Sequence, residues 1–174
     1  CFLQDYPVRL HMIGHLQSNK VKQVLQFAHL IESVDRISLA EKLQKRLEYE
    51  NRTMDVLIQV NTSNEASKFG VSPEKALDFI KAVAPYERLR IKGLMTIGLF
   101  SANEDKIRRC YKRLKEIQQE AYALNIPNAD FKELSMGMSG DLEIAIEEGA
   151  TIVRVETAIF GKRMYPDSYY WNEN

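Results

Sequence analysis

Two short stretches in the last quarter of the chain combine hydroxyl side chains with glycine, residue types that can bind phosphate. Residues 135–141 have the sequence Ser-Met-Gly-Met-Ser-Gly-Asp, and residues 157–161 have the sequence Thr-Ala-Ile-Phe-Gly. The first stretch joins a strand-like run to a helix-like run, so free backbone N–H groups and the positive end of the helix would converge there. The two stretches predict an anion site, although residues 135–141 alone fit a capped helix after a tight turn equally well.

Strand-like and helix-like runs alternate along the chain and would position these stretches. Apolar runs predict six strands, at residues 10–14, 31–34, 54–60, 91–97, 133–136 and 151–155. Apolar residues at three-to-four spacing predict helices over residues 18–29 and 103–124, and others that begin near residues 38, 72 and 139. The expected helix starts are a capping box from Ser38 to Glu41, Ser72 before Pro73, and a cap by Ser139 on a short helix that ends at Gly149.

This alternation predicts an α/β fold with a parallel sheet covered by helices, either an open doubly wound sheet or a (β/α)8 barrel. A full barrel needs about 250 residues, whereas the 174 residues of this chain fit about six such units. A phosphate commonly lies between the loops that follow the last two strands of a barrel, which is where both stretches occur. We therefore expect one partial barrel domain over residues 1–174, with residues 164–174 as a C-terminal tail.

Composition excludes several other classes of protein. The 24 basic and 24 acidic side chains cancel, so no net charge favours nucleic acid or an anionic membrane. No apolar run approaches the roughly 18 residues of a membrane span, and no signal-peptide pattern opens the chain. The two cysteines, Cys1 and Cys110, are expected to be free thiols in the cytoplasm. Because the chain begins with Cys1 and enters a strand-like segment almost at once, we expect further sequence upstream.

Six strings of the sequence resemble the pyridoxal-phosphate homeostasis protein family, which has the barrel of the alanine racemase N-terminal domain. They are HMIGHLQSNK (11–20), SVDR (33–36), VLIQVNTSNEASKFGV (56–71), GLMTIG (93–98), ELSMGMSGD (133–141) and TAIFG (157–161). The resemblance runs in order from Leu10 to about Arg163 and implies a TIM barrel with pyridoxal 5′-phosphate (PLP) at the carboxyl ends of its strands. It implies a carrier or buffer in vitamin B6 homeostasis without catalysis of its own, whose partners would be PLP and PLP-dependent apoenzymes.

In this resemblance the first predicted strand matches the third strand of the family, so the chain would correspond to barrel units three to eight. The lysine that binds PLP covalently in the family lies on the first strand, and this chain has no counterpart of it. Lys20 and Lys68 follow two of the predicted strands and lie on the expected ligand face. Each is either a substitute amine for the cofactor or, more commonly for such residues, a solvated loop lysine.

The resemblance also assigns roles to residues near the C-terminal end. Ser139, Gly140 and Thr157 would bind the phosphate, and Ser135 would approach the pyridine ring. Arg154 would lie near ring and phosphate, or else pair with a neighbouring carboxylate as an arginine at a strand end often does.

One position departs from the family pattern R-[IV]-G-[ST], which here is Arg-Val-Glu-Thr at residues 154–157. Glycine allows close backbone approach to a phosphate. Glu156 adds bulk and a negative charge beside a dianion, so we expect it to weaken binding.

Other interpretations remain open at this point. One alternative is an enzyme on the same barrel, an amino-acid racemase or decarboxylase. Racemisation needs acid/base groups on both faces of the substrate carbon, and the related racemases take one of them from a separate C-terminal domain, whereas 13 residues follow Gly161 here. A barrel lyase for a sugar phosphate would share the phosphate site but not the family strings. His11 and His15 have no third ligand at metal-type spacing, which favours a structural role. An aromatic tail is expected to pack on the last helix rather than stack on nucleic acid; its residues are Tyr165, Tyr169, Tyr170 and Trp171.

Overall fold

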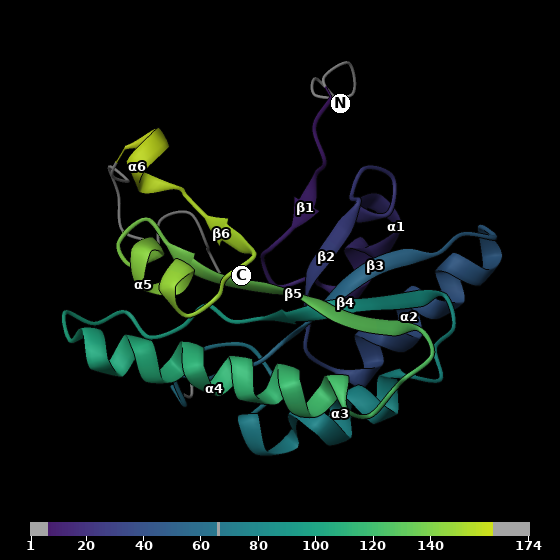
Figure 1. Cartoon of the computed structure of the whole chain (residues 1–174). Coiled ribbons are helices and arrows are strands. Elements are labelled where there is room, and N and C mark those ends of the chain that lie inside the picture. The colour runs from purple at the N-terminus through teal and green to yellow at the C-terminus, as the bar shows by residue number, and fades with distance from the viewer. Residues whose placement is uncertain (1–6, 66, 162–174) are drawn as a thin grey trace.

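The structure is a computed structural model and describes residues 7–65 and 67–161. Within these ranges six parallel strands follow one another in chain order across one sheet. The strands are β1 (His11–Met12), β2 (Leu30–Val34), β3 (Met54–Gln59), β4 (Leu89–Met95), β5 (Ala129–Met138) and β6 (Ile152–Arg154). The α/β class and the parallel sheet are confirmed, and the sheet is curled like half of a barrel (Figure 1).

Helices follow the strands and cover the convex side of the sheet, as α2, α3 and α4 do in Figure 1. They are α1 (Val21–Val24), α2 (Ile37–Tyr49), α3 (Ala76–Val83), α4 (Glu104–Tyr122), α5 (Leu142–Glu147) and α6 (Thr157–Phe160), with short 3-10 turns at Ser18–Lys20 (η1) and Pro73–Lys75 (η2). In α4 the buried residues recur every three or four positions, because one stripe of the helix packs on the sheet. The main hydrophobic core therefore lies between the sheet and these helices.

The concave side of the sheet has a different composition. A small apolar cluster of Leu30, Leu57 and Met95, with Ile152 packed against it, crosses the sheet from β2 to β6. Polar side chains that are nonetheless buried occur on β2, β5 and β6, among them Glu32, Ser135 and Arg154. Because the strands are parallel, these polar residues gather toward the carboxyl ends of the strands, the end at which barrel proteins place their sites.

Among the described residues β1 and β6 are the two edges of the sheet. The apolar side chains at these edges differ in their exposure. Ile13 is 41% exposed, whereas Ile152 and Val153 are partly buried. The edges curl toward the same side of the sheet in Figure 1.

Several local predictions were wrong. The helix expected over residues 18–29 ends at Val24, because the chain turns there and the backbone N–H of His29 donates to the carbonyl of Leu10. Ser38 lies inside the first turn of α2, whose N-cap is Arg36, so the expected capping box does not form. The strand expected at residues 133–136 extends from Ala129 to Met138, and residues 135–138 are therefore strand rather than loop. The expected tail, residues 164–174, lies outside the described residues.

The start of α5 also differs from the prediction. Its N-cap is Asp141, not Ser139. The Asp141 carboxylate accepts the backbone N–H of Met138 through Oδ1 at 2.6 Å, which closes the turn locally. Asn103 does cap α4 by accepting the backbone N–H of Lys106 at 3.0 Å, and Pro73 occupies the first turn of η2.

Candidate functional site

A chain of buried polar side chains crosses the concave side of the sheet near the carboxyl ends of the strands. Ser135 on β5 donates its hydroxyl proton to Glu32 Oε2 on β2 across 2.6 Å, and Arg154 Nη1 on β6 donates to Ser135 Oγ at 2.6 Å. Glu32 and Ser135 have no exposed surface, and Arg154 is 7% exposed. Among the described residues Arg154 therefore forms no direct ion pair with a carboxylate, and Ser135 lies between it and Glu32.

Of the three guanidinium nitrogens of Arg154, two have hydrogen-bond partners among the described residues and one has none. Nη2 donates to the carbonyl of Thr96 at the end of β4, at 2.6 Å. Within the described part of the chain, Nε is buried and has no hydrogen-bond partner. Burial lowers the pKa of Arg154, and the negative charge of Glu32 opposes that shift. Nε is therefore an unsatisfied donor among the described residues.

The two histidines have different surroundings. His11 on β1 lies 2.8 Å from Glu32 Oε1 through Nδ1 and so caps the other oxygen of the buried carboxylate. His15 stacks on Phe69, with ring centroids 4.0 Å apart, and its Nδ1 lies 3.6 Å from Asp35. In the described ranges, no group of three or more His, Cys, Asp and Glu residues could hold a metal ion.

Ser139 brings the two predicted phosphate loops together. Its Oγ accepts the backbone N–H of Glu156 at 3.0 Å and that of Ala158 at 3.3 Å. Thr157 lies between these two donors and is exposed at the start of α6. The hydroxyl oxygen thus occupies the point at which two backbone donors of the last loop converge, which is the position that an anion oxygen would take.

Gly140 and Glu156 complete the set of predicted phosphate residues. No atom lies within 4 Å of the point where a Cβ on Gly140 would be. Glu156 has a φ of −121°, a negative value that residues with side chains adopt, so the departure from glycine needs no left-handed backbone. Its side chain is partly buried.

The turn that carries Ser139 is held from below by α4. Tyr111 on α4 is fully buried and donates its hydroxyl proton to Asp141 Oδ2 at 2.7 Å. Burial, reinforced by the hydrogen bond to Asp141, raises the pKa of Tyr111 far above its ordinary value. Tyr111 therefore remains a neutral donor, and Asp141 connects it to the turn through the backbone N–H of Met138.

Neither candidate lysine is held in the buried network. Lys20 is exposed and ends η1. Lys68, in the loop after β3, donates to the carbonyl of Gly98 at 2.7 Å and pairs with Glu65. The hydrogen bond from Lys68 lowers the pKa of Glu65. Lys68 thus ties the loops after β3 and β4 together.

Sequence reasoning missed Glu32 and Tyr111. Glu32 is the one charged residue in the strand Leu-Ile-Glu-Ser-Val of β2, whose five residues are all buried, and that was the available signal. Tyr111 had no such signal, because it fits the apolar stripe of α4. Thr96 was also missed, since its contribution to Arg154 is a backbone carbonyl.

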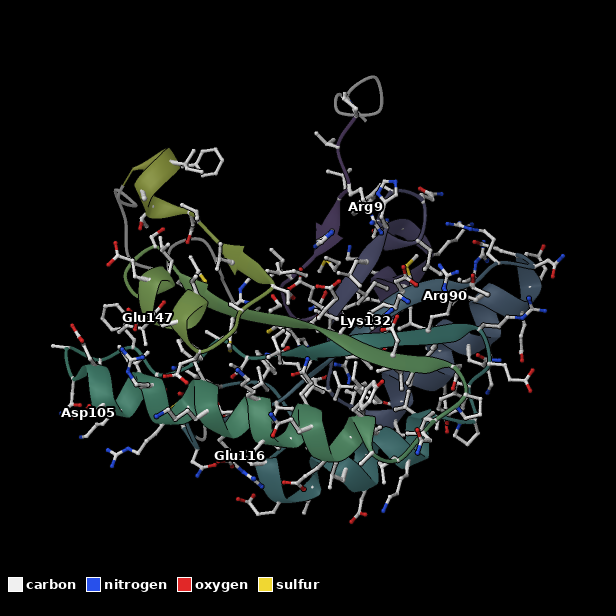
Figure 2. The ribbon with its side chains drawn as sticks, in the orientation of Figure 1. Arg9, Arg90, Asp105, Glu116, Lys132 and Glu147 are labelled. Carbon is white, nitrogen blue, oxygen red and sulfur yellow. The ribbon has the colours of Figure 1, made fainter. Side chains whose placement is uncertain are left out.

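A cavity of about 280 Å³ lies at the opposite, amino ends of the strands. Asp55 pairs there with Arg90 at 2.7 Å and with Arg9 at 3.9 Å. Figure 2 shows Arg9, Arg90 and Lys132 on the side of the sheet away from α4. The lining residues are Arg9, His11, Leu30, Asp55, Lys92, Glu133 and Ile152. Of the predicted site residues, none lines this cavity.

Comparison with known proteins gives consistent matches. The family described as "Alanine racemase, N-terminal domain" matches residues 4–164. A pyridoxal phosphate homeostasis protein from Aquifex aeolicus is 42% identical over 166 residues, which cover 94% of this chain and 71% of that protein. One from Pseudomonas aeruginosa is 39% identical and matches 94% of this chain and 68% of that protein.

Solved structures share the fold. An unknown protein from Bifidobacterium adolescentis has a TM-score of 0.85 at 44% identity, and this chain covers 61% of its length. PipY from Synechococcus elongatus with PLP bound has a TM-score of 0.81 at 29% identity, with 92% of this chain and 74% of PipY covered. An alanine racemase from Clostridium difficile, at 12% identity and a TM-score of 0.75, shares the fold alone. In the described parts of the chain, each helix is too short or too polar to cross a membrane.

Proposed function

The chain belongs to the pyridoxal phosphate homeostasis protein family, and we propose that it binds PLP at the carboxyl ends of its strands as a carrier or buffer, without catalysis of its own. The observation that carries this proposal is the identity of 42% and 39% to proteins of that name. PipY, with which this chain shares 29% identity, has been solved with PLP bound. The likeness to alanine racemase is one of fold, so we do not extend a racemase reaction to this chain.

The phosphate would lie where the loops after β5 and β6 meet. Ser139 Oγ already accepts the backbone N–H groups of Glu156 and Ala158, at 3.0 and 3.3 Å. Rotation of the Ser139 side chain would free both donors for a phosphate oxygen and turn the hydroxyl into a third donor. Thr157 and the uncrowded backbone of Gly140 would complete the site.

The pyridine ring would lie over Ser135 and Arg154. The buried Nε of Arg154 has no partner within the described residues, and a hydrogen bond to the ligand would satisfy it. PLP, when bound, supplies an aldehyde that reacts with amines. The residues of this chain bind and orient it, and Lys68 is occupied by Gly98 and Glu65, so we assign it to holding the loops rather than to the cofactor.

A titration with PLP, and with inorganic phosphate as competitor, tests this function. The Ser139→Ala, Thr157→Ala double variant should weaken the binding of both ligands, and the variant chain should remain folded. Ser38→Ala, an exposed residue in the first turn of α2, is the matched control. Unchanged affinity in the double variant would mean that the phosphate binds elsewhere, and no binding to the wild-type chain would refute the proposed function.

A carrier passes its ligand to PLP-dependent apoenzymes, which we propose as partners. The test mixes an apoenzyme with the PLP-loaded chain or with the same total amount of PLP, and measures the enzyme activity regained. Faster recovery with the loaded chain supports direct transfer. Equal or slower recovery at matched free PLP indicates a buffer that acts by release into solution.

We also propose that β1 to β6 correspond to units three to eight of the family barrel. The sequential order of the strands and the edge positions of β1 and β6 support this assignment. A closed barrel would place further strands between those edges. The 174-residue chain studied by itself should therefore dimerise or bind a hydrophobic dye. A monomer with a cooperative thermal transition and no dye binding would contradict the assignment.

A further inference from the structure

We propose that Glu32 is a positioning residue of the ligand site: through Ser135 it fixes the guanidinium of Arg154 and leaves Nε as the open donor. This inference rests on the proposed function, since the ligand concerned is PLP. Glu32 has no exposed surface and does not itself reach Arg154 by any hydrogen bond in the structure; Ser135 Oγ joins them by two bonds of 2.6 Å. Its action on the site is therefore indirect.

The direction of each hydrogen bond follows from the groups involved. An arginine can only donate, and an ionised carboxylate can only accept. The single proton of Ser135 must therefore point to Glu32, while Ser135 Oγ accepts from Arg154 Nη1. A ligand group that faces Ser135 can then meet only a lone pair, and one that faces Arg154 Nε can meet only a donor. Glu32 thereby sets which polar groups of a ligand the site accepts.

Charge supports the same assignment. The guanidinium of Arg154 is almost completely buried, and an isolated buried charge is strongly unfavourable. Glu32 is the first charged partner that stabilises it, ahead of Asp141. Asp141 is already engaged by Tyr111 and by the backbone N–H of Met138. Without Glu32, the buried charge of the guanidinium would lose its main compensating charge, and the side chain would turn toward water or toward the phosphate.

Glu32 also links side chains from strands that are not neighbours in the sheet. Glu32 and Ser135 are 103 residues apart, on strands β2 and β5 that are not neighbours in the sheet. His11 on β1 binds the second carboxylate oxygen at 2.8 Å. One carboxylate therefore connects β1, β2, β5 and, through Ser135, β6 across the concave side. If this carboxylate only linked the strands, its removal would lower the stability of the fold alone. If it positions Arg154, its removal also lowers the affinity for the ligand.

Two variants separate charge from hydrogen bonding. In Glu32→Gln the amide oxygen can still accept from Ser135, and the amide N–H can donate to His11 in its other tautomer, so the bonds persist without the charge. In Glu32→Ala both are lost. Ser33→Ala is the matched control, because Ser33 is a neighbouring residue of β2, equally buried, whose hydroxyl has no partner among the described residues.

The first readout needs no ligand. Nuclear magnetic resonance of the arginine side chains should show separate, slowly exchanging Nη signals for Arg154 in the wild type, because Ser135 and Thr96 hold its two Nη groups. We expect these signals to persist in Glu32→Gln and to merge in Glu32→Ala, with Arg154→Lys used to assign them. Unchanged signals in folded Glu32→Ala would overturn the proposal. If that variant does not fold, loss of the separate signals in folded Ser135→Ala replaces it.

The second readout is the dissociation constant for three probes: PLP, pyridoxal and inorganic phosphate. Glu32→Ala should weaken PLP and pyridoxal by about tenfold, the scale of one hydrogen bond to a charged group, and leave phosphate within about twofold. Glu32→Gln should lie between. Equal losses for all three probes, or none, would refute a role at the ring. If the wild type binds neither PLP nor pyridoxal, the proposed function fails, and the resonance signals alone decide whether Glu32 positions Arg154.

Discussion

Replacing Tyr111 by phenylalanine removes one hydroxyl from the contact between α4 and the turn that carries Ser139. That hydroxyl donates to Asp141 Oδ2 at 2.7 Å, and the ring is fully buried. A hydrogen bond to a charged acceptor contributes about 1.5–3 kcal/mol, and we take about 2 kcal/mol because Asp141 is only partly buried. For a chain of this size, that loss lowers the unfolding midpoint by roughly 4–8 °C.

Urea unfolding followed by circular dichroism measures the loss. Tyr122→Phe is the control, because Tyr122 lies on the same helix but is 65% exposed, and its free energy of unfolding should change by less than about 0.5 kcal/mol. A cycle with Asp141→Ala should give a coupling free energy of at least about 1 kcal/mol between the two residues. If Tyr111→Phe unfolds at the same urea concentration as the wild type, the contact does not hold the turn.

The pH dependence gives an independent check with a definite sign. The pKa of Tyr111 is raised in the folded chain, first by burial and then by Asp141, so the unfolded chain loses this proton first as the pH increases. The stability that the hydroxyl contributes is fully present below about pH 10 and declines above it. The difference in the free energy of unfolding between the wild type and Tyr111→Phe should therefore shrink by about 1.4 kcal/mol between pH 8 and pH 11. A constant or growing difference would contradict the raised pKa.

Three further predictions concern single positions. Burial raises the pKa of the Cys110 thiol, so in a Cys1→Ser background alkylation at pH 8 should be at least about tenfold slower in the folded than in the urea-unfolded chain; similar rates would contradict its burial. Gly137→Ala should cost about 2 kcal/mol or more, because φ is +92° and the new Cβ would lie 2.5 Å from the Cβ of Ala145; Gly14→Ala, which meets no atom within 4 Å, is the control in the same unfolding assay. Glu156→Gly should tighten PLP binding by about 1 kcal/mol, and Glu156→Gln separates charge from bulk in the same titration; equal affinities for all three chains would show that the side chain does not act on the phosphate.

The strands could be predicted from the sequence because buried parallel strands are apolar on both faces and alternate with helices. The residues at which the strands end were harder to predict. β5 continues to Met138, through Gly137, because pairing with β6 continues to Met138, which lies opposite Arg154. Ser139 has the side chain of a helix cap, yet Asp141 two residues later takes the N-cap position. A local rule could not separate these two residues, since the hydroxyl of Ser139 is taken by the last loop.

Only part of the buried polar network could be predicted from the sequence. Arg154 stands at a strand end, so a neighbouring carboxylate was a fair expectation, but its identity was not. Glu32 is 103 residues away from Ser135 along the chain, and only the curl of the sheet brings their side chains to 2.6 Å. Sequence spacing carries no information on such a contact. The isolated charge within the buried strand β2 was the one trace of it, because a buried carboxylate must have partners.

The apolar cluster of Leu30, Leu57, Met95 and Ile152 lies on the amino side of this network, and His11 spans the two regions, since it binds Glu32 and also lines the amino-end cavity. Water and mobile counter-ions would weaken the Glu32 to Arg154 interaction if they reached it, because a higher local dielectric reduces every charge interaction. The cluster therefore does more than fill space: it adds low-dielectric material between the Glu32 to Arg154 interaction and Lys92, which pairs with Asp130 at 2.7 Å. It follows that charge changes at Lys92 should affect solubility and stability but not ligand affinity. A polar residue in place of Leu57 should lower both the stability of the chain and its affinity for the ligand.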